Sequence, residues 1–270
     1  MNPAPVGLIT SGLHQLRLFF IALQFFTRLP IPRWVGFDAG WLQHAARYFP
    51  AVGLVVGTIT AAVYTLALQF WPPAVAVLLS TIASIYLTGA FHEDGFADVC
   101  DGFGGGMTPA RVLEIMQDSR VGAYGAIGIA LLLGLKCVTL TAIPSTRVAA
   151  LLLAAHPLSR LLAVGLVWRL DYVKADGKAK PLAQHMTGVE FSIALFSAVV
   201  VMAALMLCGA IDWRMLASGS ALAVLAALWL ARVFVRCIGG YTGDCLGAVQ
   251  QFSELAFYLG ALAAIGHLTR

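Results

Sequence analysis

Long apolar segments recur from one end of this chain to the other, and each is close to the roughly 20 residues that a helix needs to cross a bilayer. Only 11% of the residues are charged and the mean hydropathy is +0.86, whereas soluble domains carry about 25% charged residues. The sequence therefore predicts an all-α fold, a polytopic membrane helix bundle. We expect about seven spans, at residues 48–70, 74–91, 121–142, 148–168, 189–209, 214–236 and 245–267.

An earlier segment, residues 13–29, is apolar but interleaves Arg17, Gln24 and Arg28 with phenylalanines. This pattern suits an amphipathic helix in the membrane interface as well as a spanning helix, and both interpretations stay open. The spans leave no room for a separate soluble domain, so residues 1–270 are predicted to form a single integral membrane domain. The first twelve residues lack a basic patch ahead of a hydrophobic core, so we expect no removable signal peptide.

Lysine and arginine are distributed unevenly between the two sets of loops, which predicts the orientation of the protein. Three lie on one side: Arg147, Arg214 and Arg270. Eleven lie on the other side: Arg28, Arg33, Arg47, Arg111, Arg120, Arg169, Lys174, Lys178, Lys180, Arg232 and Arg236. Because cytoplasmic loops carry the excess of positive charge, the second side is predicted to be cytoplasmic. The net positive charge of the chain is thereby explained by the orientation of the protein in the lipid bilayer, and no nucleic acid is expected as a partner.

Acidic residues are concentrated in one cytoplasmic loop. Six of the thirteen fall within the 26 positions from Glu93 to Asp118, between two predicted spans. A carboxylate near hydrocarbon must be solvated, paired, neutralised or bound to a metal. Their concentration at one place suggests a shared ligand.

The spacing within this loop indicates the kind of ligand. If the segment continues helically from the preceding span, Asp94, Asp98 and Asp101 stand at i, i+4 and i+7 on one face, while His92 points roughly away. Three like charges on one face repel each other unless a cation compensates them. Oxygen ligands without a thiolate suit a hard ion, Mg²⁺ first and Mn²⁺ second. Small and apolar residues separate the aspartates, so we favour a metal site over a merely solvated acidic loop.

Other polar residues allow two interpretations each. Asp118 and Arg120 could add a carboxylate to the metal site and an arginine to a phosphate, or form a local surface ion pair. Asp244 opens the last predicted span, where helix capping is a serious alternative. Glu254 and Arg160 lie inside predicted spans, where ionisable residues are functional candidates. These two could pair with each other, whereas an Arg160 that reaches a cavity would suit diphosphate oxygens.

Five short motifs occur in order along nearly the whole chain. They are FFTRLPIP at 25–32, YFPAVG at 48–53, the acidic segment 92–106, MQDSRVG at 116–122 and GGYTGD at 239–244. Together they resemble the cobalamin synthase family, the adenosylcobinamide-GDP ribazoletransferases. The HxDGxxDxxDG signature at 92–102 is rather specific, whereas residues 144–236 are generic apolar sequence.

The resemblance implies a Mg²⁺-dependent enzyme of the cell inner membrane that acts late in cobalamin biosynthesis. Its substrates would be adenosylcobinamide-GDP and α-ribazole or its 5′-phosphate, joined with release of GMP; a homo-oligomer or a complex with other late corrinoid-pathway enzymes is also consistent with it. A ribose hydroxyl would attack the phosphorus that bears the cobinamide arm, with an unligated carboxylate or His92 accepting the proton. The implied site has as catalytic residues His92, Asp94 and Asp98, as metal ligands Asp94, Asp98 and Asp101, and as substrate-binding residues Arg28, Arg120, Arg160, Asp118 and Asp244.

Two other classes of protein share parts of this pattern. A membrane alcohol phosphotransferase or prenyltransferase also brings aspartates and Mg²⁺ to a diphosphate, but the DGxxAR and NDxxD patterns are absent. A divalent-cation transporter should place carboxylates along several spans, and apart from Glu254 this chain keeps them at the cytoplasmic mouth. Five cysteines without a CxxC pair indicate neither a disulfide scaffold nor a zinc site.

Overall fold

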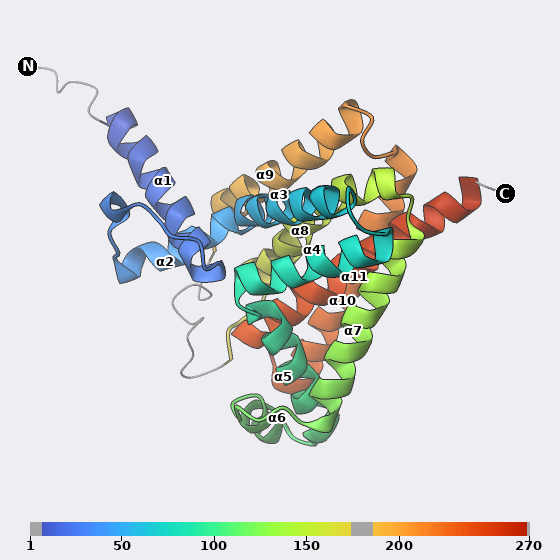
Figure 1. The fold of residues 1–270 in the computed structure, drawn as a ribbon. Helices are drawn as coiled ribbons and strands as arrows, with labels where there is room; N and C mark the ends of the chain where they lie inside the picture. Colours follow the sequence, from blue (N-terminus) through green and yellow to red (C-terminus); the bar gives the residue numbers. More distant parts are fainter. Residues whose placement is uncertain (1–6, 174–185, 269–270) are drawn as a thin grey trace, which may run out of the picture.

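The computed structural model describes residues 7–173 and 186–268, and this part of the chain is almost entirely helical (Figure 1). Its β-structure is limited, in the described residues, to one bridge between Tyr172 and Tyr241. The predicted all-α bundle is confirmed. The helices are α1 (Gly7–Phe26), η1 (Arg33–Val35), α2 (Ala39–Ala45), η2 (Ala46–Tyr48), α3 (Phe49–Ala67), α4 (Pro73–Thr88), α5 (Phe91–Gly105), α6 (Pro109–Ile115), α7 (Ala123–Ala142), α8 (Ser145–Arg169), α9 (Gly188–Leu207), α10 (Trp213–Ile238) and α11 (Gly243–Leu268).

The number of long apolar helices agrees with the prediction of about seven spans. Helices α4 and α5 qualify only together, as a broken span or a re-entrant loop, which makes seven spans if the pair counts as one; α1 is not among the qualifying helices of the described residues. Instead, α1 packs on α2, with the guanidinium of Arg17 over the ring of Trp41. The six helices that qualify singly are Gly40–Ala67, Ala123–Ala142, Ser145–Arg169, Gly188–Leu207, Trp213–Ile238 and Gly243–Gly266.

The acidic segment does not continue straight from the span before it. Helix α4 ends at Thr88 and is capped by Gly89, whose φ of 67° lies in the left-handed region, and Ala90 follows with a φ of 60°. The chain therefore turns by 90° before α5 begins. Left-handed backbone is favourable for glycine but strained for alanine. Helix α5 nevertheless contains the whole acidic signature, so the predicted i, i+4, i+7 relation holds within it.

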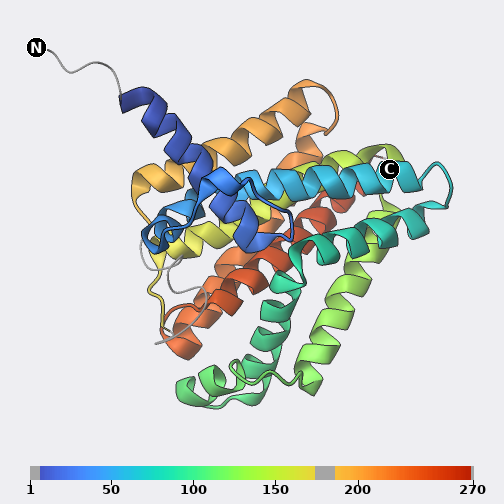
Figure 2. The ribbon, with the colours of Figure 1, turned by 60° about the vertical axis from the view of Figure 1, so that its left-hand side comes forward.

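The two predicted sets of loops lie at opposite ends of the bundle. In Figure 1 the α3–α4, α7–α8 and α9–α10 connections gather at one end, while the α4–α5 corner and the start of α11 lie towards the other. Helix α6 and the beginning of α7 extend from that second end together with α5, as Figure 2 also shows. Of the lysines counted for the orientation, Lys174, Lys178 and Lys180 lie outside the described residues.

Small residues allow the close helix crossings that build the core. On α3, a β-carbon at Gly53 would lie 2.5 Å from the carbonyl oxygen of His156 on α8. On α10, one at Gly219 would lie 2.9 Å from the carbonyl oxygen of Phe257 on α11. Small residues that bring backbones together are typical of helix pairs in membranes. Helix α11 is thereby held in the middle of the bundle, in contact with α5, α7, α8 and α10.

The start of α9 is fixed by one buried carboxylate. Glu190 forms a capping box with Thr187, and its carboxylate also pairs with Arg47 and, at 2.7 Å, with His44. A capping box satisfies two backbone N–H donors at a helix start, here those of Thr187 and Glu190. Glu190 therefore joins α9 to the α2–α3 segment at the predicted cytoplasmic end.

Candidate functional site

The two faces of α5 have opposite character. Asp94 is exposed and Asp98 and Asp101 are half-buried, whereas His92 and Glu93 are buried. The Nε2 atom of Gln251 on α11 donates a hydrogen bond of 2.8 Å to Glu93. The aspartates thus share one side of the helix and His92 lies on the other, as the helical spacing predicted.

The carboxylate of Asp101 holds the start of α7. Its two oxygens accept hydrogen bonds from the backbone N–H groups of Gly122, at 2.7 Å, and Gly125, at 2.8 Å. These N–H groups have no partner within a helix, and a carboxylate suits the positive end of the helix dipole. One of the three predicted metal ligands therefore has a structural task of its own.

The start of α11 lies against the middle of α5. A β-carbon at Gly95 would lie 2.9 Å from the carbonyl oxygen of Asp244, and one at Gly247 would lie 3.0 Å from that of His92. These glycines let the two backbones touch, which brings Asp244 to the part of α5 that carries Asp94 and Asp98. Burial and, after it, the nearby charge of Asp244 raise the pKa of the Tyr172 hydroxyl to about 12.

Asp118 and Arg120 form a local ion pair in the segment between α6 and α7. The Nε atom of Arg120 donates to both carboxylate oxygens of Asp118, at 2.9 and 3.1 Å. Its Nη2 atom donates at 2.6 Å and its backbone N–H at 3.0 Å. The side-chain and backbone hydrogen bonds from Arg120 lower the pKa of Asp118 to about 2. Two residues on, Gly122 contacts Asp101, so this exposed pair adjoins the acidic face of α5.

Arg28 lies at the corner between α4 and α5. Its backbone N–H donates to the carbonyl of Leu87 at 2.8 Å, and its guanidinium lies 5.3 Å from the ring centre of Tyr86. The side chain is exposed, and it passes over Gly89, where a β-carbon would lie 3.0 Å from its Nε atom. Arg28 thus covers the turn that precedes the acidic helix.

A cluster of ionisable side chains is buried among α7, α8 and α11. Glu254 accepts hydrogen bonds from Lys136 at 2.6 Å, from Gln250 at 2.6 Å and from Tyr258 at 3.1 Å. His156 Nδ1 lies 3.2 Å from the same carboxylate. The carboxylate of Glu254 therefore pairs with Lys136 and His156, and not, as one sequence interpretation had it, with Arg160.

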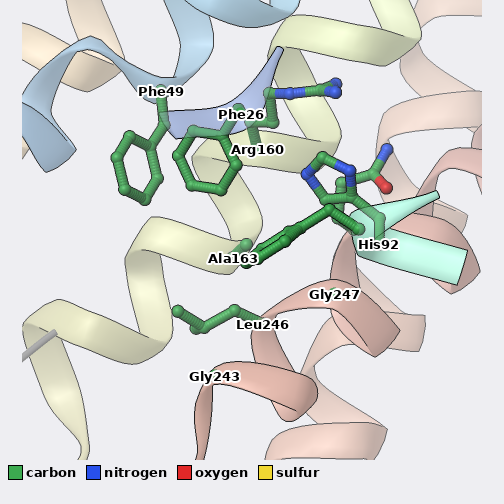
Figure 3. A pocket seen from close by; sticks show the side chains of 10 residues that line it. Phe26, Phe49, His92, Arg160, Ala163, Gly243, Leu246 and Gly247 are labelled. Carbon is green, nitrogen blue, oxygen red and sulfur yellow. The ribbon is translucent and has the colours of Figure 1, made fainter. Parts of the chain in front are cut away.

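Arg160 instead reaches a cavity next to this cluster. Its Nη1 atom donates to the carbonyl of His156 at 3.1 Å, and its Nε–H has no partner among the described residues. Figure 3 shows the cavity, in which the rings of Phe26 and Phe49 lie side by side with the imidazole of His92 beyond them. The cavity thus joins two predicted site residues, His92 and Arg160, on the side of α5 away from Asp94.

The acidic face suits a metal ion that is shared with a substrate better than a closed metal cage. No three His, Cys, Asp or Glu side chains in residues 7–173 and 186–268 are close enough to hold an ion by themselves. Mg²⁺ commonly uses one or two carboxylates, keeps several waters and completes its shell with substrate phosphates. Asp94 and Asp98, one turn apart, fit that mode, whereas both oxygens of Asp101 already accept hydrogen bonds from Gly122 and Gly125.

Sequence reasoning missed the partners of the buried charges. Lys136 lies within the predicted span 121–142 and Glu254 within the predicted span 245–267, and an intramembrane cation and an intramembrane carboxylate each need a partner. That requirement alone does not choose between Lys136 and Arg160 for Glu254. The choice depends on which faces of α7 and α8 meet α11.

Comparisons with known proteins agree with the motifs. The profile of a family described as "Cobalamin-5-phosphate synthase" matches residues 18–262. Three proteins named "Adenosylcobinamide-GDP ribazoletransferase" are similar along most of their length. One from Leptothrix cholodnii is 46% identical over 94% of this chain and 97% of its own, one from Shewanella halifaxensis 47% over 91% and 94%, and one from Ralstonia pickettii 47% over 90% and 93%. No solved structure matches the chain.

Proposed function

The chain belongs to the cobalamin-5-phosphate synthase family, and from this premise we propose that it is an adenosylcobinamide-GDP ribazoletransferase. It joins adenosylcobinamide-GDP to α-ribazole or its 5′-phosphate and releases GMP. The observation that carries the proposal is the acidic face of α5, with Asp94 exposed and Asp98 one turn further, beside the start of α11.

The reaction is a displacement at phosphorus. A free ribose hydroxyl forms a bond to the phosphorus that carries the cobinamide arm, and the bond from that phosphorus to the GMP oxygen breaks. This hydroxyl is not the 5′-hydroxyl, because the 5′-oxygen of α-ribazole 5′-phosphate is already esterified. The hydroxyl proton goes to a carboxylate on the acidic face, because His92 lies on the buried face of α5. Such reactions depend on positioning and charge neutralisation more than on covalent catalysis.

We propose that Asp94 and Asp98 hold a Mg²⁺ ion together with the substrate diphosphate. The ion would supply neutralisation of the charge that develops on the phosphate oxygens. Asp101 keeps α7 against this face through Gly122 and Gly125. Asp244 and the Arg120 side chain border the same face, where the guanidinium can meet the phosphate of the departing GMP.

One assay tests the activity and the metal assignment together. Membranes that contain the protein are incubated with adenosylcobinamide-GDP, α-ribazole and Mg²⁺, and GMP and the corrinoid product are measured. We expect Mg²⁺-dependent product from the wild type and almost none from Asp94→Asn. The control is Glu114→Gln, which removes an exposed carboxylate of α6 from outside the acidic face and should retain activity. No product from the wild type would contradict the function, and full activity of Asp94→Asn would contradict the metal site.

We also propose that the acidic face is cytoplasmic and that the membrane is the cell inner membrane. Two exposed natural cysteines test this orientation, because Cys208 ends α9 and Cys237 lies near the end of α10, one span away. In variants that retain one of them, a membrane-impermeant maleimide should label Cys208 in intact cells and Cys237 only after lysis. The opposite pattern would refute the orientation.

A further inference from the structure

The cavity behind α5 is lined along the length of helix α11. On α11 it is lined by Gly243, Leu246, Gly247 and Gln250, which share one face of the helix at i, i+3, i+4 and i+7. Seven residues of helix correspond to about 10 Å. The residues that line the cavity therefore run from the start of α11, next to Asp244 and the acidic face, into the bundle as far as Gln250.

The walls of this cavity suit a flat apolar ring. Phe26, Phe49 and Phe91 contribute aromatic surface, and the imidazole of His92 is stacked on Phe26 with 5.6 Å between ring centres. Gly247 on α11 has no side chain and Ala163 on α8 has a small one, so neither residue fills the cavity. Stacked and edge-to-face contacts with aromatic side chains are favourable for planar heteroaromatic ligands.

The inner end of the cavity offers a hydrogen-bond donor without an acceptor. Arg160 is 3% exposed, and its Nε–H has no acceptor in the described part of the chain. A buried donor without an acceptor is unfavourable, so a ligand atom that accepts this bond gains affinity. Arg160 is also the only guanidinium or ammonium group among the described residues that line the cavity, and a phosphate dianion would require more positive charge there.

We propose that this cavity binds the base of the nucleoside substrate, the dimethylbenzimidazole of α-ribazole. The inference rests on the proposed function and adds the site for one of its two substrates. The ring lies between His92 and the phenylalanines, and its unsubstituted nitrogen accepts the hydrogen bond from Arg160 Nε. The ribose then points along α11 towards Asp244, so its reacting hydroxyl reaches the acidic face of α5.

The aromatic side chains must move to admit the base. The free space inside the cavity is about 20 Å³, which is enough for about one water molecule. Rotation of a phenylalanine about its side-chain torsions opens space without moving a helix. The side chains that line this cavity, and not the positions of the helices, therefore determine which base can bind.

A pair of ligands isolates the proposed hydrogen bond. α-Ribazole is compared with the α-riboside of 5,6-dimethylindole, in which a C–H replaces the unsubstituted ring nitrogen, by equilibrium dialysis against the purified wild type and Arg160→Met. The wild type should bind α-ribazole at least about tenfold more tightly than the indole riboside. Arg160→Met should bind the two equally. Equal discrimination by both proteins would overturn the assignment of Arg160.

A second variant tests the position of the ring without changing any polar group. Ala163→Leu fills the cavity from α8, and Ala149→Leu adds the same volume on α8 at a half-buried position outside this cavity. Ala163→Leu should raise the KM for α-ribazole about tenfold or more and leave the KM for adenosylcobinamide-GDP as it is in Ala149→Leu.

The outcomes separate this inference from the proposed function. Product formation with the wild type, combined with a KM effect of Ala163→Leu on adenosylcobinamide-GDP alone, would overturn the base site and leave the function intact. An effect confined to α-ribazole 5′-phosphate would identify a phosphate site and would also overturn it. Absence of product with the wild type would refute the proposed function itself, whereas the dialysis comparison would still report on the cavity.

Discussion

The buried pair of Lys136 and Glu254 provides a stringent test of the packing in the bundle. Lys136 is 3% exposed and Glu254 is 1% exposed, and the Nζ–Oε1 distance is 2.6 Å. Glu254→Gln keeps the shape of the side chain but leaves the ammonium group without a countercharge, and Lys136→Met leaves the carboxylate with the imidazole of His156 as its only basic group within 4 Å among the described residues. Loss of one partner of a buried ion pair costs about 3–5 kcal/mol.

The double variant should recover part of that loss, because it contains neither charge. Gln250 donates to Oε2 of Glu254 and Tyr258 to Oε1, so the single amide oxygen of a glutamine at position 254 can keep one of these two bonds. Hydrogen bonds between membrane helices measured by double-mutant cycles reach only about 1.7 kcal/mol, whereas close charge pairs in dry sites reach more. We therefore expect a coupling free energy of about 2 kcal/mol or more between the two substitutions.

The assay is reversible unfolding in mixed micelles, followed by tryptophan fluorescence as the fraction of denaturing detergent increases. The matched control is the surface pair of Arg111 and Glu114, which are 2.8 Å apart with side chains 57% and 68% exposed. Its coupling should be below about 0.5 kcal/mol, as in other exposed i, i+3 pairs. A coupling for Lys136 and Glu254 no larger than that of the control would refute the reasoning.

Three further predictions concern the surroundings of α5. Gly247→Ala should destabilise the protein by about 1–3 kcal/mol in the same unfolding assay, because its β-carbon would lie 3.0 Å from a carbonyl oxygen of α5. The control is Gly134→Ala, whose β-carbon enters open space and should stabilise the protein by up to about 1 kcal/mol. Asp101→Asn should lower the thermal midpoint, because an amide accepts through one oxygen only, and the loss of stability should be about 1 kcal/mol. The same variant should leave the Mg²⁺ concentration for half-maximal activity unchanged. A higher Mg²⁺ requirement would show that Asp101 is a metal ligand. The pKa of Asp118 is lowered to about 2 by Arg120, so this ion pair is fully formed above the ordinary carboxyl pKa and is lost only as the pH falls through about 2. Asp118→Asn should therefore leave the shape of the pH–rate profile from about pH 4 to about pH 8 unchanged, and a displaced acidic limb would contradict this.

The features that could be predicted from the sequence are those that depend on neighbours along the chain. The apolar spans and the shared face of Asp94, Asp98 and Asp101 follow from segment length and helical spacing. Likewise, the ion pair of Asp118 and Arg120 joins residues two positions apart, and one sequence interpretation included it.

Contacts between distant segments could not be predicted in the same way. Asp101 reaches the start of α7 only because the chain folds back through α6. The choice of Lys136 as the partner of Glu254 depends on the rotation of α7 about its axis, which composition does not determine. The turn at Gly89 had a signal in the glycine itself, but Ala90 carries none for its left-handed conformation.

The turn between α4 and α5 explains how one short helix can serve two environments. A straight continuation of α4 would keep the acidic signature on the axis of that span, whereas the 90° bend lays α5 across the start of α11. Gly95 and Gly247 then allow backbone contact between α5 and α11. As a result Asp94 faces outward to where a charged diphosphate can be hydrated, while His92, two residues earlier, faces an apolar cavity. A charged reaction centre and an aromatic base site become neighbours across the thickness of a single helix, which is the arrangement that a nucleoside substrate with an apolar base and a reactive hydroxyl requires.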